Sequence, residues 1–169
     1  MQTAFDFGAA SALLKVRDRL RDHFGPLALP PQRTPMAQLV KSLISNKTYD
    51  RVSLAAYGRL EAAYEGWPAM AAAPASELET HIAQVRFADR KAAHLAATLG
   101  IVARERPDFD LVFLGAWPAD AAFGWLERLP GVGRKVAAST LNFSTLQRPA
   151  FVIDSHVQRV LQRLGFVGR

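Results

Sequence analysis

The sequence predicts an all-helical protein. Apolar residues recur at the three- and four-residue spacing of amphipathic helices along most of the 169 residues. Glycines and prolines separate these stretches, as is typical of helix ends. No long stretch alternates apolar and polar residues, and residues 150–153 are strand-like only in composition, so no sheet is expected. We predict roughly nine or ten helices.

The first two helices are placed by their apolar stripes and end signals. The first closes at Gly25-Pro26, and its apolar residues are Leu13, Leu14, Leu20 and Phe24. The second begins after Thr34, an N-cap residue followed by a proline at the first helical position. Its stripe falls at i, i+3, i+4, i+7 and i+8: Met36, Leu39, Val40, Leu43 and Ile44. The proline-rich segment 28–32 is the expected joint between two lobes.

Polar residues that commonly cap helix N-termini predict the helices in the middle of the chain. Residues 76–79 form an S-x-x-E capping box beginning at Ser76. Asp89 is expected to cap a helix that fades at Gly100 or soon after. Asp110 is expected to start a short helix, and Asp120 the helix that follows it.

Composition and net charge limit which classes of site and partner are expected. Half of the chain is hydrophobic, and it contains no cysteine, which excludes disulfides and thiolate metal sites within this chain. The four histidines are scattered, so a metal site is not expected. The net charge is +6, and residues 127–169 carry seven Lys or Arg against two Asp or Glu. This basic region suits a polyanion such as nucleic acid, although a solvated basic surface has the same composition.

The stretch LPGVGRK, residues 129–135, lies within this basic region. A helix before it stops at Pro130, and an apolar stripe after it indicates a second helix. Gly131 and Gly133 permit backbone angles forbidden to other residues and leave the amide groups bare. Amides at the positive end of a helix form an anion site that could hold a phosphate without reading sequence. The alternative is a plain turn between two helices.

Lys135 stands at the start of the second helix, where a cation opposes the helix dipole. The positive helix end, partial desolvation and neighbouring Arg134 would favour the neutral amine, which is a nucleophile able to form a Schiff base. The alternative is a solvated surface lysine. Nineteen residues later, Asp154 precedes another amphipathic helix. Its commonest role is an N-cap; as a carboxylate facing the lysine it could also accept a proton or steady a cation.

These residues resemble a known family. The stretches LERLPGVGRKVAASTLNF and FVIDSHVQRVLQRLGF are similar to the helix-hairpin-helix (HhH-GPD) DNA glycosylases, most of all the endonuclease III branch. PMAQLVKSLISNKTYD, ending at Asp50, and IAQVRFADRKAAHL resemble the early helix and a middle segment of that family more loosely.

The resemblance implies a two-lobed helical fold with a DNA-binding cleft, into which a damaged base is flipped. It implies a helical barrel lobe at residues 31–147, with the helix-hairpin-helix at about 120–145. Residues 1–30 and 148–169 would form a second lobe, which is shortened at its C-terminal part relative to the family. Lys135 would attack C1′ of the flipped nucleotide and release the base. The Schiff base would then allow strand cleavage by β-elimination, making the protein a bifunctional glycosylase and AP lyase assisted by Asp154.

The resemblance also implies the DNA contacts. Hairpin residues would hold a backbone phosphate: Leu129, Gly131, Val132, Gly133 and Arg134. Lys47 and Phe87 lie where the family inserts side chains into the gap left by the flipped base. The sequence departs from the family pattern at two positions. The family usually has a glutamine near position 47, where this chain has lysine, and a glycine at position 86, where this chain has arginine.

The remaining expectations concern cofactors, partners and location. No iron–sulfur cluster is expected in a chain without cysteine, whereas a monovalent cation on the hairpin carbonyls is compatible with the family. The expected partner is double-stranded DNA with a damaged base or an abasic site, with oxidised pyrimidine as the default substrate. We expect a monomer that is cytoplasmic and nucleoid-associated, with no membrane partner. The alternatives are a non-catalytic helix-hairpin-helix module that binds DNA backbone, a helical scaffold that binds protein only, and a glycosylase without lyase activity.

Overall fold

The prediction of an all-helical fold is confirmed. The computed structural model describes residues 7–26 and 31–168. These residues form nine α-helices and one 3-10 helix, and within these two ranges no strand is present. One isolated bridge joins Arg33 and Ser144. None of the helices in the described ranges is long and apolar enough to cross a membrane.

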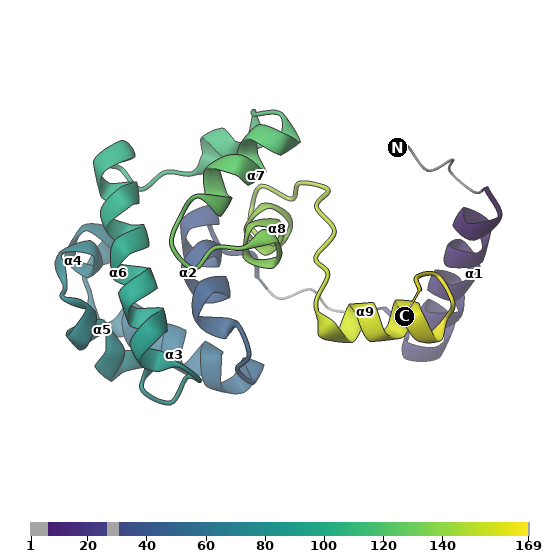
Figure 1. The fold of residues 1–169 in the computed structure, drawn as a ribbon, viewed down its shortest axis with the longest axis horizontal. Helices are drawn as coiled ribbons and strands as arrows, with labels where there is room; N and C mark the ends of the chain where they lie inside the picture. The colour runs from purple at the N-terminus through teal and green to yellow at the C-terminus, as the bar shows by residue number, and fades with distance from the viewer. Residues whose placement is uncertain (1–6, 27–30, 169) are drawn as a thin grey trace. The chain divides into compact units, whose positions relative to one another are not determined.

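The chain divides into two units (Figure 1). One comprises residues 1–31 and 153–169 and contains α1 (Phe7–Phe24) and α9 (Ser155–Arg163). The other, residues 32–152, contains the remaining helices. These are α2 (Pro35–Ser45), α3 (Asp50–Ala63), α4 (Gly66–Ala72), α5 (Ala75–Ile82), α6 (Ala88–Glu105), the 3-10 helix η1 (Val112–Gly115), α7 (Ala119–Glu127) and α8 (Arg134–Phe143).

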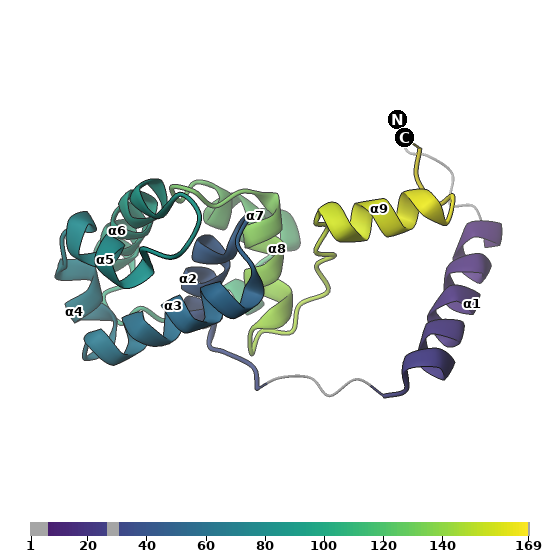
Figure 2. The same ribbon diagram turned by 90° about the horizontal axis from the view of Figure 1, so that it is seen from below.

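Helix α2 forms the centre of the larger unit. It lies between α6 and α8 (Figures 1 and 2), and its apolar stripe is almost completely buried. Thr34 is the N-cap, as predicted, because its hydroxyl oxygen accepts the amide of Ala37 at 3.3 Å, and Pro35 occupies the first helical position. The core is therefore built around the helix whose periodicity is clearest in the sequence.

Three predicted N-caps are wrong in the same way. Ser76, Asp89 and Asp120 each lie at the second helical position, because α5, α6 and α7 begin two residues earlier than expected. The residues at the N-cap positions are Pro74, Phe87 and Pro118, and none of them makes a side-chain capping bond. Acids in the first turn still interact favourably with the helix dipole, and Glu77, Asp89 and Asp120 lie there in α5, α6 and α7.

Other element boundaries also differ from expectation. Helix α6 continues five residues past Gly100 because its buried stripe extends through Val102. Asp110 does precede a short helix, but this helix is the 3-10 helix η1. The carboxylate of Asp110 accepts the amide of Val112 at 2.8 Å. Helices α3 and α4 are not among the predicted helices.

In the smaller unit, the apolar residues of the helices remain exposed. On α1, Leu13, Leu14, Leu20 and Phe24 are about half exposed or more, and α9 has no buried residue. The apolar periodicity predicted for both helices is present, but the described residues bury little of it.

Candidate nucleic-acid interface

A helix-hairpin-helix lies in the larger unit, where α7 and α8 are joined by residues 128–133. The turn is closed by the amide of Val132, which donates to the carbonyl of Leu129 at 3.1 Å. Helix α6 supports it from below, because the hydroxyl of Thr98 donates to the carbonyl of Pro130 at 3.0 Å. The hairpin is thus bonded both internally and to α6.

The two hairpin glycines, which both permit unusual backbone angles, have different roles, because only Gly131 adopts such angles. Gly131 has φ of +77°, and a Cβ there would come within 2.6 Å of Nδ1 of His94. Gly133 is extended with φ of −98° and ψ of −179°, angles open to any residue. A Cβ at Gly133 would meet no atom within 4 Å, so glycine there leaves open space in front of the helix start.

That open space faces unpaired amides. The first backbone bond inside α8 runs from Ala137 to Gly133, so the amides of Arg134, Lys135 and Val136 have no acceptor within the helix. Gly133, the N-cap, has no side chain that could accept them. Three amides at the positive end of a helix can bind an anion such as a phosphate oxygen.

The other predicted hairpin residues differ in burial and in what their side chains contact. The side chains of Leu129 and Val132 are buried in the core, so any contact they make with a ligand goes through their backbone groups. The guanidinium of Arg134 lies 3.5 Å from the ring centre of Phe123 and 3.5 Å from the carboxylate of Glu127. Its charge is therefore directed back toward α7.

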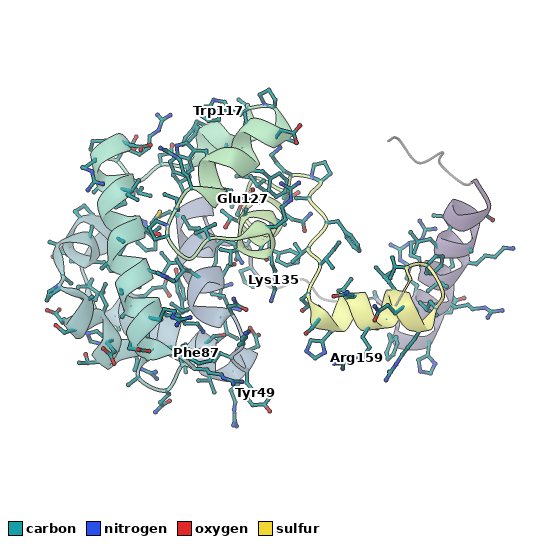
Figure 3. The ribbon with its side chains drawn as sticks, in the orientation of Figure 1. Tyr49, Phe87, Trp117, Glu127, Lys135 and Arg159 are labelled. Atoms are coloured by element: carbon teal, nitrogen blue, oxygen red, sulfur yellow. The ribbon has the colours of Figure 1, made fainter. Side chains whose placement is uncertain are left out.

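Lys135 differs from its neighbour. Its side chain is exposed, contrary to the partial desolvation expected from the sequence, and projects outward from the second position of α8 (Figure 3). The amine is thus accessible to a ligand held at the hairpin amides.

Asp154 is the N-cap of α9, as predicted. One carboxylate oxygen accepts the amides of His156 and Val157 at 2.9 and 2.8 Å. These two bonds fix the orientation of the carboxylate. Asp154 belongs to the smaller unit and Lys135 to the larger one.

Lys47 and Phe87 occupy two turns of the larger unit. Both have left-handed backbones, with φ of 54° and 61°, which non-glycine residues rarely adopt. Lys47 is exposed, and Phe87 is 48% exposed although it precedes a buried helix. Strained residues with exposed side chains are typical of functional sites.

Two residues of this region were missed by the sequence analysis. Tyr49, the N-cap of α3, is 87% exposed and lies with Phe87 along the lower edge of the unit in Figure 3. Lys91 is buried, and its ammonium donates to three oxygens of residues 44–48. Burial lowers the pKa of Lys91 to about 8. A signal did exist for Lys91, because it falls four residues before Leu95 on an apolar stripe.

The described side chains do not form a metal site. No group of three or more His, Asp or Glu side chains in the described part of the chain is placed to hold a metal ion. The fit of this chain to an iron–sulfur cluster is equally poor, because it lacks cysteine.

Comparison with known proteins decides the family. The model of the HhH-GPD superfamily of base excision DNA repair proteins matches residues 40–169. The chain belongs to the HhH-GPD superfamily. This HhH-GPD protein is 30% identical over 142 residues to the chloroplastic endonuclease III homolog 1 of Arabidopsis thaliana, covering 83% of the chain and 35% of that relative.

Solved structures agree with the HhH-GPD assignment. A non-covalent endonuclease III–DNA complex superposes with a TM-score of 0.76 at 25% identity, covering 94% of this chain and 70% of that one. The 8-oxoguanine glycosylase/lyase of Clostridium acetobutylicum, in complex with double-stranded DNA, has a TM-score of 0.71 at 18% identity, covering 94% and 58% of the two chains, and shows the shared fold. The chain spans less than half the length of the curated plant relatives it matches.

Proposed function

We propose that this protein is a base excision repair enzyme, a bifunctional DNA glycosylase and AP lyase that acts through a Schiff base on Lys135. The observation that carries the proposal is the exposed amine of Lys135 at the unpaired N-terminus of α8, behind the open space at Gly133. A phosphate bound by these amides would bring a sugar near the amine.

The proposed reaction has two stages. Nζ of Lys135 forms a bond to C1′ of a flipped nucleotide, and the C1′–N bond to the base breaks, so that the base leaves with the bonding electrons and takes up a proton. The resulting aminal nitrogen loses one proton, and the C1′–O4′ bond then breaks as O4′ takes up a proton, which opens the sugar ring and leaves an iminium between Nζ and C1′. Loss of a C2′ proton then expels the 3′ phosphate by β-elimination. The carboxylate of Asp154, oriented by its two cap bonds, is proposed to accept the amine proton or stabilise the sugar cation.

Binding is proposed to use the hairpin and the two turns. The amides following Gly133 would hold a backbone phosphate, a contact that positions the DNA without reading its sequence. Lys47 and Phe87 would enter the gap left by the flipped nucleotide. A monovalent cation on the hairpin is proposed to bind backbone carbonyls, each of which has two lone pairs and can accept a second partner.

The proposed partner is double-stranded DNA with a damaged base or abasic site, bound by a monomer at the nucleoid. Oxidised pyrimidines are the proposed substrates, on the resemblance to endonuclease III. Release of base from duplexes containing thymine glycol or 8-oxoguanine compares the two main substrate classes directly.

Borohydride trapping on an abasic duplex tests the chemistry. The wild-type protein should form a covalent adduct, and Lys135→Ala should not. Lys15→Ala, which removes another exposed lysine, is the matched control and should trap like the wild type. An adduct of equal yield with Lys135→Ala contradicts the assignment of the nucleophile.

Asp154→Asn separates the charge from the cap. Asparagine caps helices as well as aspartate does, so folding should be retained. The proposed role requires the carboxylate, and the trapping rate should fall by at least about a hundredfold, as for lost acid–base catalysis. An unchanged rate assigns Asp154 to capping alone.

The second candidate is a non-catalytic module that binds DNA backbone, which the hairpin amides alone would support. It predicts retardation of duplex DNA without any covalent adduct. A protein-binding scaffold predicts no retardation at low salt.

A further inference from the structure

The two turns that carry Lys47 and Phe87 are connected by one buried side chain. Lys91, on α6, is 7% exposed, and its ammonium donates to the carbonyls of Ile44 and Asn46 at 2.8 and 2.5 Å. A third bond reaches the hydroxyl of Thr48 at 3.1 Å. An ammonium has three hydrogens and no acceptor, so these three oxygens use its full donor capacity.

These contacts enclose Lys47. Asn46 and Thr48 are the residues on either side of it, and Ile44 lies in the last turn of α2, whose carbonyls lack partners within the helix. A cation at a helix C-terminus is favourable for the same reason. The left-handed backbone of Lys47, with φ of 54°, is thus held from both sides by one buried group.

The second turn is bonded by the backbone of Lys91, in the first helical hydrogen bond of α6, and by the hydroxyl of Thr48. The backbone amide of Lys91 donates to the carbonyl of Phe87 at 3.0 Å. The hydroxyl of Thr48, which accepts the Lys91 ammonium, also accepts the amide of Arg86 at 3.2 Å. One hydroxyl therefore joins the turn before α3 to the turn before α6, although the two lie 38 residues apart in sequence.

We infer that Lys91 is a positioning residue that, with Thr48, fixes the spacing and backbone of the two turns so that Lys47 and Phe87 can probe DNA together. Lys91 is buried and therefore does not contact DNA itself. The inference rests on the proposed function, because probing a damaged duplex is the reason to hold two exposed, strained residues in register.

Two variants test this connection. Lys91→Met keeps an apolar stem and removes all three donors, and Thr48→Val keeps the side-chain shape and removes the shared hydroxyl. The matched control is Arg59→Met, because Arg59 likewise donates to a backbone carbonyl, that of His81 at 2.8 Å, and joins α3 to α5 away from both turns.

The first measurement needs no DNA. Hydrogen exchange of the Arg86 amide should accelerate about tenfold in Thr48→Val, the factor expected for one lost hydrogen bond. It should also accelerate in Lys91→Met, where the Thr48 hydroxyl loses the donor that positions it, and should stay unchanged in Arg59→Met. Wild-type exchange in both variants overturns the connection between the turns.

The second measurement is the ratio of affinities for a duplex with a tetrahydrofuran abasic analogue and for the intact duplex. This analogue cannot form a Schiff base, so Lys135 chemistry does not contribute. The ratio should fall about fivefold or more in both variants and hold in Arg59→Met, whatever their stabilities. An unchanged ratio, or an equal fall in Arg59→Met, overturns the role of Lys91. A wild-type protein without preference for the analogue overturns the proposed function instead, while the exchange measurement still decides whether Lys91 joins the turns.

Discussion

Gly131 and Gly133 lie two residues apart, yet their substitution should have different effects. Gly131→Ala places a Cβ 2.6 Å from His94 at a positive φ, and it should lower the free energy of unfolding by about 2 kcal/mol or more. Gly133→Ala meets neither strain nor neighbours and should lower the free energy of unfolding by about 1 kcal/mol at most, because alanine is a poorer N-cap, while the new methyl group obstructs the amides and weakens DNA binding. Thermal unfolding and duplex retardation measure the two effects. Equal stability losses contradict the assignment.

Lys91 makes stability depend on pH. Burial lowers its pKa in the folded protein to about 8, below its ordinary 10.5. Between these values the unfolded chain binds more protons than the folded one, so the free energy of unfolding rises with pH from about 8 to 10.5, by up to about 3 kcal/mol.

Urea unfolding from pH 7 to 10 checks this, taken as the difference between wild type and Lys91→Met. Groups present in both proteins cancel, including Tyr64, for which burial raises the pKa to about 12. A flat difference curve contradicts the expectation.

At the scale of elements, Thr34 and Ser76 are two hydroxyl residues near helix N-termini that have different roles. Thr34→Ala removes the cap of α2 and should lower the free energy of unfolding by about 1 kcal/mol. Ser76→Ala should change it by less than about 0.5 kcal/mol, because Ser76 is exposed inside α5. Denaturant midpoints measure both, and a larger loss at Ser76 supports the capping box instead.

The sequence predicts helices well where the signal is local. The stripe of α2, the hairpin glycines and the Asp154 cap are all set by residues within one or two turns. Helix α4 was missed because Pro68 reads as a helix breaker, although it lies in the first turn, where a missing amide costs no internal bond. Helix α3 was missed because its buried face includes Ser53 and Ala56 rather than a clear apolar stripe.

The candidate site also has a part with a local sequence signal and a part without one. The hairpin and Lys135 could be predicted from a seven-residue motif. The hydrogen-bond acceptors of Lys91 could not, because they lie 43 to 47 residues earlier and only the packing of α6 against the end of α2 brings them within reach. Periodicity indicates which face of a helix is buried, but not the polar groups that it meets there.

At the scale of the whole molecule, the charge distribution predicts how binding responds to salt. The net charge is +6, and residues 127–169 contribute most of the excess. Affinity for intact duplex should fall at least about tenfold between 50 and 200 mM salt, because phosphate contacts release counterions. Fluorescence anisotropy at several salt concentrations measures the slope. Binding that is insensitive to salt contradicts a phosphate-based interface.

The left-handed backbones at Lys47 and Phe87 bear on how the chain would evolve. Glycine or asparagine would adopt these angles with less strain, which amounts to roughly 1 kcal/mol or more at each position. A population selected only for heat tolerance should therefore accumulate glycine at position 47, where the exposed lysine contributes little packing. Retention of lysine under such selection would indicate that the proposed contact with DNA also constrains position 47.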